Sequence, residues 1–311
     1  MSGSVMVFAP APVLTVTIER HAGRQDLHVH AGGQGVWQAR MLASLGCEVR
    51  LCVGVGGEIG AVLADVLGRL DPAITLHAVT LGAGSGWYVH DRREGERAEI
   101  AEEPGPPLRR HDLDELANMA LEQGLRADVS VLSGPADPAI VDADTYRRLA
   151  ADLGANGGTV VADLSGDLLA AVVAGGPAFV KVSHEELLAD GRAGDDGVPA
   201  LVDAARKLRA EGAGAVLVSR AGEPAVAVYG EHRVAAVHVP KLQVVDPRGA
   251  GDSMSAGVAA VLAGGGDLEE AIRTGAAAGA LNVTRHGLGS GPGSTVRELL
   301  TRTYLEPLEA S

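Results

Sequence analysis

Asp246-Pro247-Arg248-Gly249-Ala250-Gly251-Asp252-Ser253 is the most informative stretch of this 311-residue chain. It follows an apolar, strand-like run from Val234 to Val245, which Pro240 interrupts, and it precedes a small-residue segment that predicts a helix from Ser253 to about Ala263. Gly249 and Gly251 allow the backbone to turn tightly. The free N–H groups and the dipole at the start of the following helix favour a bound anion. The stretch therefore predicts a strand, an anion-binding turn and a helix.

Asp252 places a carboxylate inside this predicted anion site, where it would repel a phosphate. One interpretation is chemical: the carboxylate accepts a proton from a hydroxyl group that attacks a phosphoryl group held by the turn. The other interpretation is structural: Asp252 only caps the helix. The turn by itself leaves both open.

Two glycine-rich segments together resemble a known family. Gly249-Ala250-Gly251-Asp252-Ser253 is similar to the C-terminal signature of the PfkB (ribokinase-like) carbohydrate kinases, in the 1-phosphofructokinase and tagatose-6-phosphate kinase branch. Gly32-Gly33-Gln34-Gly35-Val36-Trp37-Gln38-Ala39 resembles the N-terminal signature, and the resemblance extends over essentially the whole chain. It implies that Gly249, Ala250 and Gly251 form an anion hole for the transferred phosphate, and that Asp252 is the catalytic base.

Composition agrees with a soluble cytoplasmic enzyme. A formal net charge of −14 argues against nucleic acid as a partner, because phosphate backbones are bound by basic surfaces. No apolar run approaches the roughly 18 to 20 residues needed to cross a bilayer, and no signal-like segment opens the chain, so no membrane partner is expected. Cys47 and Cys52, the two cysteines, lie in apolar surroundings and are expected to be buried thiols.

Strand-like and helical runs alternate along most of the chain, which indicates a parallel sheet covered by helices on both faces. We expect one PfkB-like domain over 1–311, an α/β fold with a three-layer α/β/α arrangement and a mainly parallel central sheet. Two alternating, polar-rich segments near 14–31 and 87–102 break the rhythm. The resemblance implies that they form a small β-sheet lid over the sugar and the contact of a homodimer; an ordinary hairpin-rich edge is the alternative.

The resemblance also implies a site for ATP and Mg²⁺. Lys181-Val182-Ser183-His184-Glu185-Glu186 matches a nucleotide-binding segment in which Ser183 replaces an Asn, Lys181 contacts phosphates, and Glu186 holds hydrated Mg²⁺ without a direct metal bond. Further nucleotide contacts are expected from Ser219, Gly222 and Asn282. Arg248 either stabilises the phosphoryl group in transfer or faces solvent.

The substrate side departs from the sugar-phosphate kinases of the family. Gln34 and Trp37 occupy the positions of a Lys and an Asn, Val13 that of an Asp, and Gly86 that of an Arg. A dianionic phosphate without a cation is poorly stabilised. The sequence therefore predicts that fructose 1-phosphate, fructose 6-phosphate and tagatose 6-phosphate are poor substrates. The expected contacts with an uncharged or ring-bearing alcohol are Val13, Gly32, Gly33, Gln34, Trp37 and Trp87, although either tryptophan could instead be a core residue.

The sequence favours ATP-dependent phosphorylation of a hydroxyl group on a sugar-like or nucleoside-like molecule, with Asp252 as base. Two alternatives remain. One is a non-catalytic member of the fold that binds a nucleotide or small ligand. The other is a sugar-phosphate kinase with a rebuilt phosphate clamp, whose cation would come from Arg20, Arg24 or Arg92 in the lid.

Overall fold

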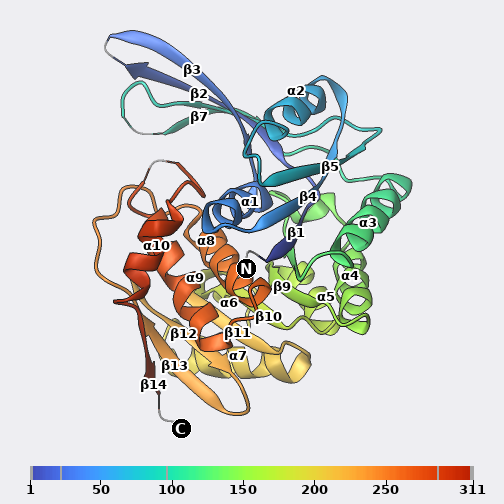
Figure 1. The fold of residues 1–311 in the computed structure, drawn as a ribbon. Coiled ribbons are helices and arrows are strands. Elements are labelled where there is room, and N and C mark those ends of the chain that lie inside the picture. Colours follow the sequence, from blue (N-terminus) through green and yellow to red (C-terminus); the bar gives the residue numbers. More distant parts are fainter. Residues whose placement is uncertain (1–2, 22, 96, 286, 309–311) are drawn as a thin grey trace.

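A ten-stranded sheet runs through the part of the chain that the computed structural model describes, residues 3–21, 23–95, 97–285 and 287–308 (Figure 1). Its strand order is β14-β13-β12-β11-β10-β9-β8-β1-β4-β5. Pairing is parallel from β11 to β5 and antiparallel from β11 to β14. The strands are β1 Ser4–Ala9, β4 Glu48–Val55, β5 Ile74–Thr80, β8 Val129–Ser133, β9 Thr159–Asp163, β10 Phe179–Ser183, β11 Ala215–Arg220, β12 Glu223–Tyr229, β13 Arg233–His238 and β14 Tyr304–Pro307.

Helices cover both faces of this sheet because its central strands are apolar on both sides. In β1, Val5 and Val7 face one hydrophobic cluster while Met6 and Phe8 face the other, as expected for a strand whose side chains alternate. The first cluster packs under α1 Gln34–Leu45, α2 Gly57–Leu67, α8 Ala250–Ala263, α9 Leu268–Asn282 and α10 Gly293–Leu300. The second packs under α3 Arg110–Gly124, α4 Ala143–Ala155, α5 Gly166–Ala174, α6 His184–Ala189 and α7 Val198–Glu211. The predicted three-layer α/β/α fold is confirmed.

A second, four-stranded sheet projects from one end of the molecule (Figure 1). Its order is β3-β2-β6-β7, with β2 and β6 parallel and the other neighbours antiparallel. The strands are β2 Val13–His21, β3 Arg24–Gly32, β6 Trp87–Asp91 and β7 Ala98–Glu103. These strands coincide with the two segments predicted from the sequence to form a small sheet. That the sheet closes over a substrate stays a prediction.

Two boundaries around the glycine-rich turn differ from the sequence prediction. The strand ends at His238 and not at Val245, because Pro240 lacks the N–H group that pairing requires. The chain from 239 to 249 is a loop in which Val244 and Val245 are exposed. Helix α8 begins at Ala250, three residues before the predicted start, so the anion-binding turn includes the first turn of the helix.

Both cysteines are buried free thiols, as predicted. Burial raises the pKa of Cys47 to about 11 and that of Cys52 to about 12, so both stay protonated at neutral pH. Within the described residues, no helix has the length and apolar character needed to cross a bilayer.

Candidate active site

The glycine-rich turn places the first N–H groups of α8 at the carboxyl-terminal edge of the parallel strands. Gly249 adopts the left-handed conformation, with φ of 69°, that lets the chain reverse into the helix. The amides of Ala250, Gly251 and Asp252 are the first three of the helix, and such amides lack partners within a helix. The Asn282 side chain holds the turn from behind by donating to the carbonyl of Arg248 at 2.6 Å. That Gly249, Ala250 and Gly251 bind an anion stays a prediction.

Lys181 lies directly behind this turn. A methyl group built on Gly251 would come within 2.3 Å of the Lys181 Nζ atom, so glycine is the residue that allows the approach. Lys181 is buried in the middle of β10, and its Nζ donates to Asp163 Oδ1 at 3.2 Å. Burial alone would lower the pKa of Lys181, but the charges of Asp163, Glu186 and Asp252 raise it, so the amine stays protonated.

Asp163 at the end of β9 connects these elements. Its Oδ2 atom accepts hydrogen bonds from Ser255 Oγ at 2.7 Å and from Gln38 Nε2 at 3.1 Å. Its Oδ1 atom accepts a hydrogen bond from the Lys181 ammonium group. The side-chain oxygen of Gln38, Oε1, in turn accepts a hydrogen bond from the Ser133 hydroxyl group. Gln38, Ser133 and Ser255 are fully buried, Asp163 is 1% exposed, and Lys181 is 6% exposed. The network fixes the positive charge of Lys181 relative to helices α1 and α8.

The environment of Asp252 suits a carboxylate that exchanges a proton. Burial, followed by the charge of Asp163, raises the pKa of Asp252 to about 7, against the opposing effects of Lys181 and a hydrogen bond from Gln34. A group with a pKa close to neutral can be ionised before a reaction and protonated after it. The alternative role as a helix cap is not what the structure shows, because Asp252 is the third residue of α8 and Gly249 occupies the cap position.

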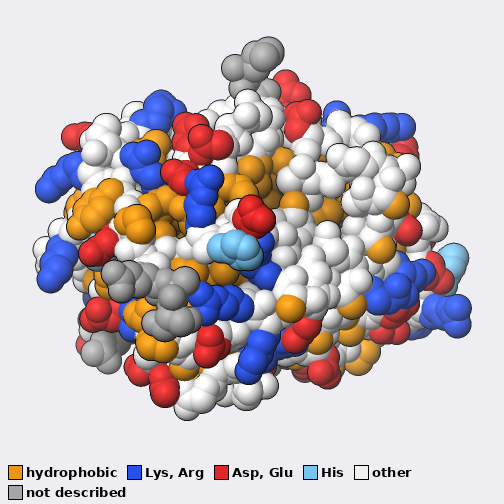
Figure 2. All heavy atoms as spheres, turned by 90° about the horizontal axis from the view of Figure 1, so that it is seen from below, with side chains coloured by type: hydrophobic (Ala, Val, Ile, Leu, Met, Phe, Trp, Pro, Cys, Tyr) orange, Lys and Arg blue, Asp and Glu red, His pale blue; other side chains and the backbone are white. Residues whose placement is uncertain are grey.

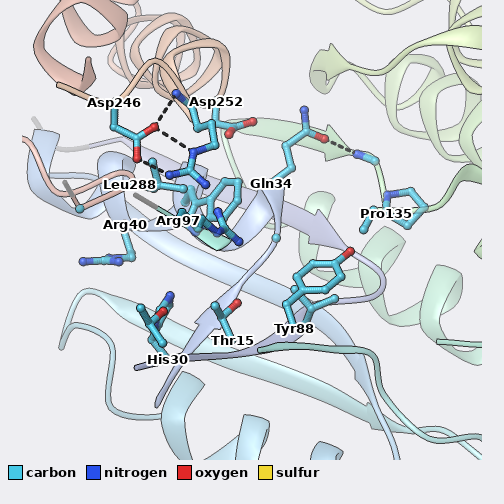
Figure 3. A pocket seen from close by; sticks show the side chains of 18 of the residues that line it. Thr15, His30, Gln34, Arg40, Tyr88, Arg97, Pro135, Asp246, Asp252 and Leu288 are labelled. Carbon is cyan, nitrogen blue, oxygen red and sulfur yellow. Dashed lines mark hydrogen bonds and ion pairs between the residues drawn. The ribbon is translucent and has the colours of Figure 1, made fainter. Parts of the chain in front are cut away.

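A cavity of about 880 Å³ opens in front of Asp252 and extends to the four-stranded sheet (Figure 3). This volume is within the range of small-molecule sites in proteins. The residues that line it come from the small sheet, from α1, from the ends of β8 and β9, and from the loop before α8. In Figure 3, Gln34 and Pro135 lie on one side, and Arg40 and Arg97 lie on the other below Asp246.

Four of the six predicted substrate contacts line this cavity, namely Val13, Gly33, Gln34 and Trp37. Gln34 Oε1 accepts the N–H of Gly134 at 2.6 Å, which joins the start of α1 to the loop after β8. Gly32 and Trp87 do not line the cavity. Trp87 lies beside Leu14 across the small sheet, is partly buried and packs against the hydrophobic core, as in the alternative that the sequence had left open. Its contact with a substrate stays a prediction.

Ser183 and Glu186 form a capping box at the start of α6. Ser183 Oγ accepts from the N–H of Glu186 at 3.2 Å, and Glu186 Oε2 accepts from the N–H of Ser183 at 2.7 Å. Glu186 also lines the cavity. Its Oε1 atom makes no hydrogen bond to any described residue, which leaves a carboxylate oxygen for a hydrated cation. The Ser183 hydroxyl, in contrast, is already engaged with the backbone.

Other predicted contacts lie outside the cavity. Ser219 and Gly222 are at the β11–β12 hairpin, and Gly222 is exposed. Asn282 is fully buried, and its Oδ1 atom accepts from the N–H of Gly289 at 3.0 Å while its amide group donates to Arg248. Both polar atoms of the Asn282 side chain thus hold the loop around the turn, and a contact of Asn282 with the nucleotide stays a prediction. Gln38 of the N-terminal signature also lies outside the cavity, and both polar atoms of its side chain make hydrogen bonds to Asp163 and Ser133.

Arg248 lines the cavity but its guanidinium group is tied to Asp246. The Nε atom lies 2.9 Å from Asp246 Oδ1 and the Nη2 atom 2.5 Å from Oδ2. The Arg248 side chain is 41% exposed. It is therefore partly open to solvent, and its guanidinium group is held by Asp246. On the face shown in Figure 2, described Lys and Arg side chains are interspersed with Asp and Glu and do not form a continuous basic strip.

The sequence did not single out Arg40 and Arg97 as cavity residues. Arg40 follows Gln34 and Trp37 along α1 at three-residue spacing, and that spacing is the signal that could have placed it on the same side of the helix. Arg97 lies just before β7, and nothing local to the sequence indicates that this chain segment approaches the cavity.

Comparison with known proteins identifies the class to which this fold and site belong. Residues 3–294 match the pfkB family carbohydrate kinase description, and the chain belongs to this family. It is a phosphotransferase that acts on an alcohol group, as the sequence predicted, and membership of a kinase family implies that it uses ATP.

Two relatives carry the same name. The chain is 33% identical over 251 residues to the 1-phosphofructokinase of Rhodobacter capsulatus, covering 79% of this chain and 77% of the relative. It is 31% identical over 263 residues to the 1-phosphofructokinase of Bacillus subtilis (strain 168), covering 84% of each. The chain thus fits the 1-phosphofructokinase-like branch that the resemblance indicated.

Solved structures agree on the fold. Phosphofructokinase-2 from Escherichia coli in complex with potassium has a TM-score of 0.83 and 24% identity, with 97% of this chain and 99% of that chain covered. Ribokinase from Arabidopsis thaliana complexed with ribose and ATP has a TM-score of 0.73 and 21% identity, with 96% and 99% covered.

Proposed function

We propose that this protein transfers the γ-phosphoryl group of ATP to a hydroxyl group of a sugar or sugar-like acceptor, with Asp252 as the base. The observation that carries the proposal is the position of Asp252: its buried carboxylate faces the cavity from the third residue of α8, beside the N–H groups of Gly251 and Ala250. An acceptor hydroxyl in the cavity can then donate to Asp252 while the transferred group lies over the helix N-terminus.

Each part of the site has one role in this proposal. The amides of Gly249, Ala250 and Gly251 hold the transferred group, and Lys181 behind them supplies a fixed positive charge. Because the transition state of phosphoryl transfer is loose, Asp252 mainly orients the hydroxyl oxygen and takes its proton late. Mg²⁺ would neutralise charge on the ATP phosphates, and Glu186, with one carboxylate oxygen directed to no described protein group, would hold a water of its hydration shell.

The charge of the acceptor is the open element of the proposal. Gln34 and Gly86, where the family has cations, motivated the prediction that hexose phosphates are poor substrates. The names of the two relatives favour a sugar phosphate instead. Three guanidinium groups that line the same cavity, those of Arg40, Arg92 and Arg97, support the sugar-phosphate alternative as well.

The experiment is ADP release from MgATP with a panel of acceptors: fructose, fructose 1-phosphate, fructose 6-phosphate, tagatose 6-phosphate, glycosides and nucleosides. We expect acceptor-dependent turnover that falls by at least about 100-fold in Asp252→Asn. Asp65→Asn, an equal change on the exposed face of α2, is the matched control and should leave turnover unchanged. Turnover that Asp252→Asn retains in full would contradict the assignment of the base.

We also propose a homodimer through the small sheet, as the sequence predicted. Leu27 on β3 is 60% exposed and Ile100 on β7 is 54% exposed, which is unusual for large apolar side chains on one small sheet. The inhibited form of Escherichia coli phosphofructokinase-2 is described as tetrameric. Light scattering of the parent chain and of Ile100→Lys tests the proposal: a dimer that becomes a monomer supports it, and a parent chain that is a monomer contradicts it.

A further inference from the structure

We propose that Gln34 is a positioning residue for Asp252, because the N–H group of Gly134 fixes the Gln34 side-chain amide with its NH2 group toward the Asp252 carboxylate. This inference rests on the proposed function and concerns the base of that site. Gln34 is the first residue of α1, Gly134 follows β8, and Asp252 lies in the first turn of α8. The contact thus joins three elements that are far apart in the sequence.

The start of α1 lies against the ends of the central strands. Gly33, which precedes the helix, has a φ of 108°, and the chain reverses there into α1. A methyl group built on Gly35 would come within 2.5 Å of the Ala9 Cβ atom and 3.1 Å of the Ser133 Oγ atom, so a glycine permits this approach. The Gln34 side chain therefore begins beside the loop that follows β8, in the lining of the cavity.

The peptide group between Ser133 and Gly134 is held from both sides. Its carbonyl oxygen accepts a hydrogen bond from the Tyr146 hydroxyl group at 2.8 Å, and its N–H group donates to Gln34 Oε1 at 2.6 Å. Tyr146 on α4 and Ser133 are both fully buried. Because the C=O and N–H groups of a trans peptide point in opposite directions, the Tyr146 contact also fixes the direction of the N–H group. Hydrogen bonds in such a series polarise one another.

The N–H group of Gly134 determines which way the Gln34 amide faces. A side-chain amide has an oxygen that accepts and an NH2 group that donates, and only the oxygen can pair with an N–H donor. In Figure 3 the Gln34 amide lies between Asp252 and the loop at Pro135. A flipped amide would place two donors against each other at Gly134 and an oxygen against the carboxylate. The NH2 group is therefore directed to Asp252, and it donates a hydrogen bond to the carboxylate.

The carboxylate of Asp252 lies among charges from three other elements. Burial, followed by the charge of Asp163 on β9, raises its pKa, and Glu186 on α6 adds to this effect. Lys181 on β10 lowers the pKa of Asp252, and so does the hydrogen bond from Gln34, because a donor stabilises the ionised form. Among the described residues, no other side chain donates a hydrogen bond to Asp252. A carboxylate has two oxygens, so one can be held by Gln34 while the other accepts the substrate hydroxyl group.

A neutral amide at position 34 differs in its effect from the lysine that the family's sugar-phosphate kinases have there. A lysine would place a full positive charge beside the carboxylate and hold its pKa low. The Gln34 amide orients the carboxylate while the pKa of Asp252 stays raised to about 7. A base whose pKa is close to the working pH is the most effective in proton transfer. Gln34 therefore both orients the base and sets its affinity for the proton.

A series of substitutions at position 34 tests the inference. The measured quantity is kcat/KM for the acceptor that is turned over, which should rise with pH as Asp252 ionises. Gln34→Leu removes the donor and should move this rise to higher pH by about one to two units. Gln34→Lys supplies a positive charge and should move the rise to lower pH by about one to two units. The parent chain should lie between the two variants.

Gln123→Leu is the matched control. Gln123 is 5% exposed on α3, its side-chain oxygen accepts from Arg50 at 3.2 Å, and it does not line the cavity. The rise of kcat/KM should stay in place in this variant. Gln34→Lys provides the test if Gln34→Leu does not fold, and circular dichroism monitors the folding of each variant.

Two simpler roles of Gln34 predict other results. If Gln34 only contacted the substrate, Gln34→Leu would raise KM equally at every pH. If Gln34 only joined α1 to the loop after β8, Gln34→Leu would lower stability. Either result with an unmoved rise of kcat/KM would overturn the inference.

Carbon-13 NMR titration of the Asp252 carboxyl group measures the same shift without turnover, and Asp252→Asn identifies the resonance. The midpoint should move in the same direction as the rise of kcat/KM in each variant. If the midpoint moves in Gln34→Leu but Asp252→Asn retains turnover, the contact stands and the proposed function fails. If Asp252→Asn loses turnover and neither the midpoint nor the rise moves in Gln34→Leu, the proposed function stands and the positioning role of Gln34 fails.

Discussion

Lys181 Nζ lies 3.2 Å from Asp163 Oδ1, and both side chains are buried beneath the turn that begins α8. This pair joins the end of β9 and the middle of the neighbouring strand β10 to the helix that carries Asp252. A positive charge fixed under the helix N-terminus adds to the helix dipole, so the same few atoms stabilise the fold and favour an anion above the turn.

Removal of one partner of this pair is expected to be more costly than removal of both. Lys181→Met leaves the Asp163 carboxylate buried without its counter-charge, and we expect the free energy of unfolding to fall by about 3–5 kcal/mol. In Lys181→Met/Asp163→Asn the residual charge is gone and an acceptor oxygen remains for Ser255 and Gln38, so part of the stability should return. Urea unfolding measures both.

The control for this comparison is the exposed pair of Arg69 and Asp65 on α2. Arg69→Met should cost less than about 1 kcal/mol, because exposed ion pairs contribute little. A Lys181→Met variant that is no less stable than Arg69→Met would contradict the structural role of the buried pair.

Gly251→Ala tests the close approach of Lys181 to the anion-binding turn. The added Cβ would lie 2.3 Å from Lys181 Nζ, so either the turn or the lysine must move. We expect turnover to fall by about 10²- to 10³-fold, the effect typical of a lost oxyanion-hole donor. Gly264→Ala at the other end of α8 is the matched control, because its Cβ would meet Val261 O at an ordinary 3.5 Å and its φ is −79°. Equal activity of the two variants would contradict the role given to the turn.

The features that could be predicted from the sequence are encoded locally. The turn around Gly249, the start of a small-residue helix and the alternation of strands and helices depend on neighbours within a few residues. The fold class followed from these patterns, whereas the substrate-side position of Gln34 and Trp37 followed from the family resemblance. The early end of β13 is also a local effect, and Pro240 was its signal.

The rest depends on contacts between distant parts of the chain. The Gln38 amide group donates a hydrogen bond to Asp163, which lies 125 residues later in the sequence. The role of Gln38 could therefore not be derived from the helix that carries it. Arg40 and Arg92 line the same cavity although one lies on α1 and the other follows β6 of the small sheet. Trp87 is partly buried against the core and lies beside Leu14, which is 73 residues earlier in the sequence. A pattern in a single segment cannot reveal such partners.

The pH dependence of catalysis should report the pKa of Asp252. Since the base must be ionised and its pKa is raised to about 7, kcat/KM for the acceptor should rise about tenfold per pH unit below 7 and level off above it. Asp163 raises this pKa and Lys181 lowers it. Asp163→Asn should therefore move the rise of kcat/KM to lower pH, and Lys181→Met should move this rise to higher pH. If both variants moved the rise of kcat/KM in the same direction, the rise would report the ionisation of a group other than Asp252.

Asp252→Asn should be more stable than the parent chain at alkaline pH, in spite of its lost activity. In the unfolded chain Asp252 ionises near pH 4, whereas in the folded chain it keeps its proton until about pH 7. Between these values the folded state binds more protons, so the parent loses stability as pH rises and the asparagine variant does not.

The expected gain for Asp252→Asn is on the order of 1–3 kcal/mol at pH 8 and close to zero at pH 4. Urea unfolding at both pH values measures it, with Asp65→Asn as the control, for which no such pH-dependent gain is expected because Asp65 is exposed. A stability difference that does not grow with pH would mean that the carboxylate of Asp252 is not the group held neutral by burial, and the assignment of its raised pKa would fail with it.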